Sequence, residues 1–204
     1  MKKFELTSET KINIFGKKLF RIKALISFAD VEAGETGGWV EKEGNVNQSG
    51  NAWVSGNAWV SGNAMVSGNA MVSGNAMVSG DAKVYGDAKV SGNAMVSGNA
   101  KVYGDAKVSG NAMVSGNAWV SGDAKVYGDA MVSGNADYTT IHGFGAQFRT
   151  TTFFRCKDKK VRVACGCFFG TIPEFREQVK NTRKGKIAEE YLMIADLMEK
   201  HFEK

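Results

Sequence analysis

The chain has 204 residues and a formal net charge of +5, with 25 glycines, one proline and three cysteines. This length allows one elongated body or one domain with terminal caps. No stretch approaches the roughly 20 apolar residues of a membrane span, and the first residues lack the apolar core of a secretory signal. The odd cysteine count, without disulfide-framework spacing, favours a reducing environment. We therefore expect a cytoplasmic protein that does not associate with membranes.

Residues 1–47 are predicted to form an N-terminal β cap. Short strands are expected over 3–7, 12–15 and 18–28, and a turn-rich segment over 34–38. From Gly38 onward the glycines already have the phase of the repeat that follows. The cap should therefore merge into the first repeating unit.

A six-residue phrase, Val-(Ser/Tyr)-Gly-(Asn/Asp)-Ala-X, occupies the middle of the chain. Its valines recur every six residues from Val54 to Val132. Side chains alternate along a strand, so Val and Ala should point inward while X and Ser point outward. Gly followed by Asn or Asp is expected to form each corner, because both residue types tolerate positive φ. Such a unit can bury its apolar side only against its neighbours, which predicts a solenoid.

Three sides of six residues would close a triangular coil of about 18 residues. Residues 48–136 are therefore predicted to form about five coils of a parallel β-helix, in which units three apart stack into outward ladders. The first ladder would hold Trp53, Met71, Lys89, Lys107 and Lys125. The second would hold Trp59, Met77, Met95, Met113 and Met131. The third would hold Met65, Lys83, Lys101, Trp119 and Asp137.

The second ladder is apolar from end to end. Five such side chains would expose about 500 Å², near the upper limit for a soluble monomer, so we expect this face to be covered. Another copy of the chain is the favoured cover, which makes the protein a homo-oligomer. The alternative covers are the C-terminal helices, folded back on this face, and a foreign partner. The simplest alternative is that the face has no cover and the methionines merely occupy an exposed strand surface.

The other two ladders carry all the lysines of the repeats, and four of the five follow the pattern Asp-Ala-Lys. Asp and Lys two apart on a strand share a side, so local ion pairing is the simpler interpretation. The alternative is an anion-binding groove that uses Lys83 and Lys101 beside Tyr85 and Tyr103.

Residues 137–204 are predicted to form a separate module with a β-hairpin and two helices. Alternating patterns at 149–156 and 161–169 predict the hairpin, with 157–160 as its loop. Thr171 begins a capping box for a helix over about 173–183, and a second amphipathic helix should follow Gly185. Positive charge gathers on the hairpin: Arg149, Arg155, Lys157, Lys159, Lys160 and Arg162 face only Asp158. Interleaved phenylalanines make this region a candidate for binding nucleic acid, a nucleotide or another polyanion.

Val-Ser-Gly-Asn-Ala-Met resembles the repeat of the hexapeptide-repeat proteins, over about 90 of the 204 residues. The resemblance implies a left-handed parallel β-helix and a trimer, but it is poorly specific for function. Acyltransferases of this family use an acyl-CoA donor and a histidine near a subunit groove. Here the repeats contain no histidine and no inserted loop, and His142 is only a weak catalytic candidate.

The flanks, including Ala33-Gly-Glu-Thr-Gly-Gly-Trp-Val-Glu41 and Gly166-Cys-Phe-Phe-Gly-Thr171, resemble those of uncharacterised phage and bacterial hexapeptide-repeat proteins, many labelled transferases on fold alone. The cysteines at 156, 165 and 167 lack the usual zinc spacing. We expect no metal and no cofactor. The resulting hypothesis is a non-enzymatic binding or scaffold protein, phage-encoded, that engages or inhibits a host component. An acyltransferase and a polyanion-binding protein are the alternatives.

Overall fold

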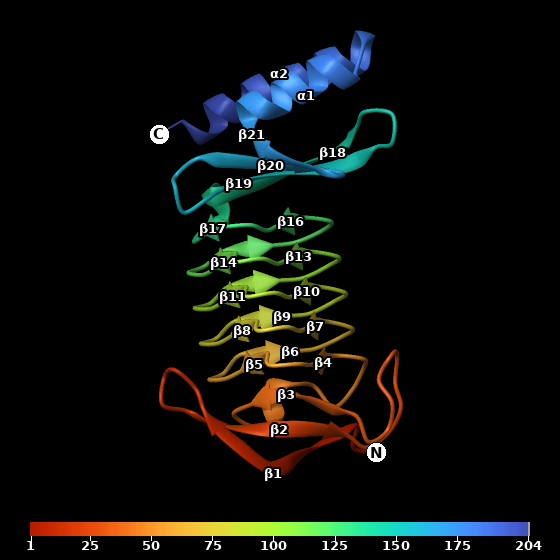
Figure 1. Ribbon diagram of the computed structural model, residues 1–204, viewed down its shortest axis with the longest axis vertical. Helices are drawn as coiled ribbons and strands as arrows, with labels where there is room; N and C mark the ends of the chain where they lie inside the picture. Colours follow the sequence, from red (N-terminus) through yellow and green to blue (C-terminus); the bar gives the residue numbers. More distant parts are fainter. Residues whose placement is uncertain (204) are drawn as a thin grey trace.

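The computed structural model describes residues 1–203 and has the shape of a column (Figure 1). An N-terminal sheet closes one end, short stacked strands form the shaft, and a second sheet carrying two helices closes the other end. The fold is mainly β, as the repeat predicts. Among the described residues, no helix combines the length and apolarity that a bilayer crossing requires.

The N-terminal sheet contains β1 (Phe4–Ile12), β2 (Lys18–Ala24) and β3 (Thr36–Val40). The strand expected over 12–15 is wrong, because the Asn13 N–H donates to the Lys17 carbonyl at 2.9 Å and closes a turn. The strand expected over 18–28 ends at Ala24. The expected turn at 34–38 instead runs into β3, whose Gly37 has no room for a Cβ beside Trp53.

The repeats form three parallel sheets, each built from strands of two residues. One sheet continues from β3 through β5, β8, β11, β14 and β17; the others hold β4–β7–β10–β13–β16 and β6–β9–β12–β15. Their bounds are Trp53–Val54 (β4), Trp59–Val60 (β5), Met65–Val66 (β6), Met71–Val72 (β7), Met77–Val78 (β8), Lys83–Val84 (β9), Lys89–Val90 (β10), Met95–Val96 (β11), Lys101–Val102 (β12), Lys107–Val108 (β13), Met113–Val114 (β14), Trp119–Val120 (β15), Lys125–Val126 (β16) and Met131–Val132 (β17). Units three apart pair in register, which confirms the predicted stacking and the coil of three sides. The left-handed winding stays a prediction.

The interior of the column is built from the two inward positions of the repeat. Every repeat valine from Val54 to Val132 and every repeat alanine from Ala52 to Ala130 is buried, and together they form one continuous core. The alternation of inward and outward side chains is therefore confirmed. The expected place of Asp137 on the third ladder is wrong, because the short 3₁₀ helix η2 (Asn135–Asp137) ends the repeat, and its Asn135 Oδ1 accepts from the Trp119 N–H at 2.8 Å.

Each corner depends on its glycine. The turns lie at the expected Gly-Asn and Gly-Asp pairs. The corner glycines have φ between +59° and +72°, whereas none of the described Asn or Asp residues has positive φ, so only glycine supplies the left-handed conformation expected of both residue types. The glycines also stack, and a Cβ added to Gly92 would lie 3.0 Å from the Gly110 nitrogen. The Asn and Asp side chains instead link coils, as in Asn93 Nδ2–Asn111 Oδ1 (3.1 Å).

The N-terminal end of the stack exposes backbone carbonyls, and side-chain donors satisfy them. The buried Lys3 ammonium donates to the carbonyls of Gly50 (3.2 Å) and Ala52 (2.8 Å). Asn45, which ends the 3₁₀ helix η1 (Glu43–Asn45), donates through Nδ2 to the carbonyls of Gly62 and Ala64 at 3.1 and 2.8 Å. These donors replace the backbone N–H groups that a preceding coil would supply.

The C-terminal module has a sheet of β18 (Tyr138–Phe144), β19 (Arg149–Arg155), β20 (Val161–Cys165) and β21 (Phe168–Thr171), followed by α1 (Ile172–Thr182) and α2 (Gly185–Phe202). The predicted hairpin and both helices are confirmed, as is the capping box at Thr171. Strand β18 was not predicted, and the single strand predicted over 161–169 is divided into β20 and β21 by a turn at Gly166, which has φ +63°. Within the described residues, the helices pack on this sheet and not on the second ladder, so they are not its cover.

We expect Gly92→Ala to destabilise the column more than Gly122→Ala. Both glycines have positive φ, but an added Cβ at Gly122 meets nothing within 4 Å. Both variants should therefore lose about 1–2 kcal/mol because alanine disfavours this backbone conformation. Only Gly92→Ala should lose more, because its Cβ also collides with the next coil. Urea denaturation measures the two losses; equal losses would show that glycine stacking adds no constraint.

Lys3 should make stability depend on pH. Burial lowers the pKa of Lys3 from 10.5 to about 8. Between these values the unfolded chain keeps a proton that the folded chain has released, so this group makes the free energy of unfolding rise with pH. We expect wild type to gain stability relative to Lys3→Met as the pH rises from about 8 to about 10.5. A constant difference across this window would contradict the shift.

Candidate binding surfaces

The second ladder forms a face that we call the methionine face: the outward side chains Met77, Met95, Met113 and Met131 of β8, β11, β14 and β17. Adjacent methionines are paired in register, as Met95 is with Met77 and Met113. The first three are half-buried and Met131 is 42% exposed. The outward neighbours on these strands are serines, and no charged residue occurs within 74–80, 92–98 or 110–116. The face is therefore uncharged over three successive coils.

Trp59, which the sequence places on this ladder, is covered by the chain itself. It is only 7% exposed, because Leu19 and Trp39 pack on it and the Phe15 ring meets it edge to face at 5.8 Å. Trp59 is therefore not accessible for the interface in which the sequence predicted it. The loop between β1 and β2 brings Phe15 there, and the open surface is smaller than the predicted 500 Å². Met77 also packs against this cluster.

The lysine ladders do not form the expected local ion pairs. Within residues 1–203, no ion pair joins a lysine of the repeats to an aspartate. At two of the four Asp-Ala-Lys units the corner geometry explains this difference, because the aspartate points along the stack: Asn69 Nδ2 donates to Asp87 Oδ1 at 3.0 Å and Asn63 Nδ2 to Asp81 Oδ1 at 3.1 Å. The simpler interpretation of Asp-Ala-Lys is therefore wrong.

The third face brings together the residues proposed for an anion groove. Tyr85 and Tyr103 stack with their ring centroids 5.0 Å apart and their planes 2° apart. The Lys101 ammonium lies 4.2 Å from the ring centroid of Trp119, which is 46% exposed. Lys101 is thus engaged in a cation–π contact, and Lys83 is the exposed lysine of this face.

Among the residues that the structure describes, two arginines of the basic hairpin, Arg155 and Arg162, are paired, whereas its loop lysines are not. Arg162 donates to Asp158 Oδ2 at 2.7 Å, and Arg155 lies 3.6 Å from Asp137 Oδ1 while donating to the Phe202 carbonyl. The Lys160 backbone N–H, together with Arg162, holds the pKa of Asp158 below its ordinary value. Over the described part of the chain, the exposed loop lysines form no ion pair: Lys157, Lys159 and Lys160. The loop therefore presents three uncompensated ammonium groups.

His142 and the cysteines are spread over different environments. His142 is exposed on β18, and its Nδ1 lies 3.0 Å from Thr150 Oγ1. Cys156 belongs to the core of the repeats, where burial raises the pKa of its thiol to about 11. Cys165 and Cys167 line a cavity in the C-terminal module. Residues 1–203 contain no cluster of three or more His, Cys, Asp or Glu with metal-binding geometry.

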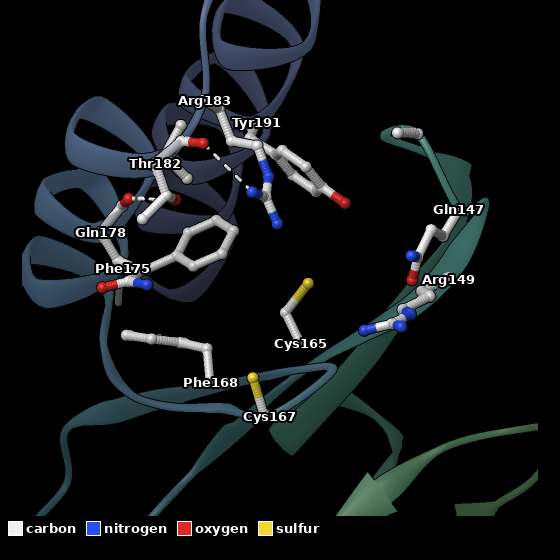
Figure 2. Close-up of a pocket in the computed structure, with 12 residues that line it drawn as sticks. Gln147, Arg149, Cys165, Cys167, Phe168, Phe175, Gln178, Thr182, Arg183 and Tyr191 are labelled. Carbon is white, nitrogen blue, oxygen red and sulfur yellow. Dashed lines mark hydrogen bonds between the residues drawn. The ribbon is translucent and has the colours of Figure 1, made fainter.

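That cavity was not predicted from the sequence. Figure 2 shows Arg149 from β19 and Arg183 from the segment after α1, both directed into the space above Cys165 and Cys167. The Tyr191 hydroxyl donates to the Phe144 carbonyl at 3.3 Å beside the same space, and burial raises the pKa of this phenol. Of the predicted anion-binding residues, only Arg149 lies here. Arg183, at the end of the helix predicted over about 173–183, was the sequence signal that could have pointed to the site.

Comparison with known proteins supports the fold and leaves the activity open. Five stretches match the family model of the YdcK beta solenoid repeat: residues 60–73, 65–80, 70–86, 88–104 and 106–122. The array is a β-solenoid. All of the matched residues lie in the repeats and cover less than half of the chain, so the match describes the shaft and neither cap. No curated protein matches the chain.

Proposed function

We propose that this β-solenoid is a non-enzymatic binding or scaffold protein that associates with copies of itself through the methionine face. The observation that carries the proposal is the uncharged surface of β8, β11 and β14, where outward methionines alternate with serines. This surface lies between two faces that carry lysines. A second copy has the same spacing between coils, so rows of methionine and serine can fit together. Methionine side chains adapt readily to such a contact.

The assembly that we favour is a trimer, which rests on the resemblance to hexapeptide-repeat proteins. The phage origin and the engagement of a host component rest on the same kind of resemblance, in the flanks. The acyltransferase alternative receives no support from His142, whose ring, within the described residues, hydrogen-bonds only to Thr150. We therefore favour binding over catalysis.

A second candidate function is polyanion binding by the loop between β19 and β20. It is favoured by the three exposed lysines of this loop, because Asp158 is already engaged by Arg162. The loop is also held in place, since the Lys157 N–H donates to the Asp129 carbonyl of the last coil at 3.0 Å. Such a loop fits a phosphate backbone without a requirement for sequence.

We expect Met95→Glu combined with Met113→Glu to lower the oligomeric mass. Two carboxylates buried in an apolar contact would lack partners and oppose association. Light scattering should give about three times the monomer mass of 21.9 kDa for wild type and the monomer mass for the variant.

The matched control is Ser91→Glu with Ser109→Glu, which adds two carboxylates at neighbouring coils on the β10 and β13 face. It should keep the oligomeric mass. A monomeric wild type, or an unchanged mass in the folded methionine variant, would refute self-association through this face.

Charge reversal of Lys157, Lys159 and Lys160 to Glu should abolish the salt-sensitive retention of the protein on a heparin column. Reversal of Lys180, Lys186 and Lys200 to Glu changes the net charge equally but acts on the helices, and it should leave most retention in place. Retention is measured as the salt concentration at elution. Equal losses in the two variants would show that net charge, and not the loop, determines retention.

A further inference from the structure

The cavity of the C-terminal module has a volume of about 320 Å³, at the lower end of the range for small-molecule sites. Its walls come from the β18–β19 turn, the β20–β21 turn and both helices (Figure 2). It is separate from the methionine face and from the loop lysines, so its role is independent of the proposed self-association.

The charged groups that line the cavity are both positive. Arg149 and Arg183 both line it, and no Asp or Glu occurs among its lining residues. Within residues 1–203 neither guanidinium forms an ion pair, whereas Arg155, Arg162 and Arg176 each do. In the described part of the chain, the Arg183 guanidinium donates only to the Thr182 carbonyl, at 3.1 Å. Most of the donor capacity of both guanidinium groups is therefore open to a ligand.

The backbone at the β20–β21 turn lets Arg149 take up this position. Its Nη1 would lie 2.6 Å from a Cβ added at Gly166, so any other residue there would push the guanidinium away. Gln147 and Gln178 add amide groups at the rim. The site thus holds two forked cations over one space, an arrangement suited to the paired oxygens of a carboxylate or a phosphate.

The opposite wall of the cavity is apolar and aromatic. Phe175 lies 5.4 Å from Phe168 and 5.7 Å from Tyr191 between ring centroids, and Val179 completes this wall. Phe175, Val179 and Tyr191 are buried, so they form a firm surface. A ligand that met the arginines with its anionic end would place the rest of its body against these rings.

We propose that this cavity binds a small organic oxyanion, in which a carboxylate or phosphate monoester is attached to an aromatic or short apolar group. Arg149 and Arg183 hold the oxyanion, and Phe168, Phe175 and Tyr191 contact the apolar part. A carboxylate and a phosphate monoester would both accept hydrogen bonds from the arginines. Probes that carry one group or the other distinguish them.

The test is calorimetric titration of the full-length protein with phenyl phosphate and benzoate, beside inorganic phosphate and phenol. At least one aromatic oxyanion should bind more tightly than both inorganic phosphate and phenol. Which of the two binds better identifies the charged group. Phenol binding as tightly would refute the role of the arginines, inorganic phosphate binding as tightly would refute the aromatic wall, and no binding at millimolar concentrations would refute the site.

Arg149→Gln and Arg183→Gln should each weaken the better ligand about tenfold, as expected for the loss of a charge-assisted hydrogen bond. Lys180→Gln removes the same charge from α1 outside the cavity and should leave the affinity unchanged. A similar loss of affinity in all three variants would show that net charge alone determines binding, and it would overturn the assignment of the two arginines to the site.

A second measurement does not depend on any substitution. The exposed Cys167 lines the cavity, so the ligand should slow its alkylation by iodoacetamide, followed by mass spectrometry. Unchanged alkylation at a saturating ligand concentration would place the ligand elsewhere and overturn the proposal.

Discussion

Backbone N–H groups in the array donate to carbonyls of the following coil, as Trp59 N does to Ala76 O at 3.0 Å and Met95 N to Ala112 O at 2.8 Å. Because the bonds from the X, Ser or Tyr, and Asn or Asp positions all point this way, the stack presents mainly carbonyls on one side and mainly N–H groups on the other. The two caps are chemically opposite for this reason. Lys3 and Asn45 supply donors at the N-terminal end, and Asn135 Oδ1 and Thr152 Oγ1 supply acceptors at the C-terminal end, the latter to the Lys125 N–H at 3.0 Å.

The same stacking leaves only the outward positions free to differ between units. Val and Ala are buried at every level, and each corner needs its glycine, so a substitution there acts on the fold. The outward X position has no such structural requirement. The residues at X make one face uncharged and place lysines on the other two. The faces of the shaft therefore differ mainly in which residue occupies X at each level.

The period of the repeat was enough to predict the coil, the inward residues and the three ladders, because each unit meets only copies of itself. Prediction failed where a residue meets a segment that does not repeat. Trp59 is covered by Phe15 from a loop, and Asp137 leaves its ladder because η2 replaces the next unit. At two of the Asp-Ala-Lys units the Asp–Lys pairing failed for another reason: Asp81 and Asp87 accept hydrogen bonds from asparagines at the matching corner of the preceding coil, which the sequence of a single strand does not show. The cavity was missed because Arg149 and Arg183 are brought together by the packing of α1 on the sheet.

Strand β19 joins the two parts of this protein through side chains that alternate across it. Phe154 belongs to the core of the repeats, whereas its neighbour Phe153 belongs to the core beneath the helices. Thr152 accepts the last coil's Lys125 N–H, while Arg149 at the start of the same strand faces the cavity. One layer of sheet thus closes the stack on one side and supports the cavity on the other. Loosening of the last coil would therefore move the strand that positions Arg149, so the stability of the shaft and the geometry of the cavity are coupled through β19.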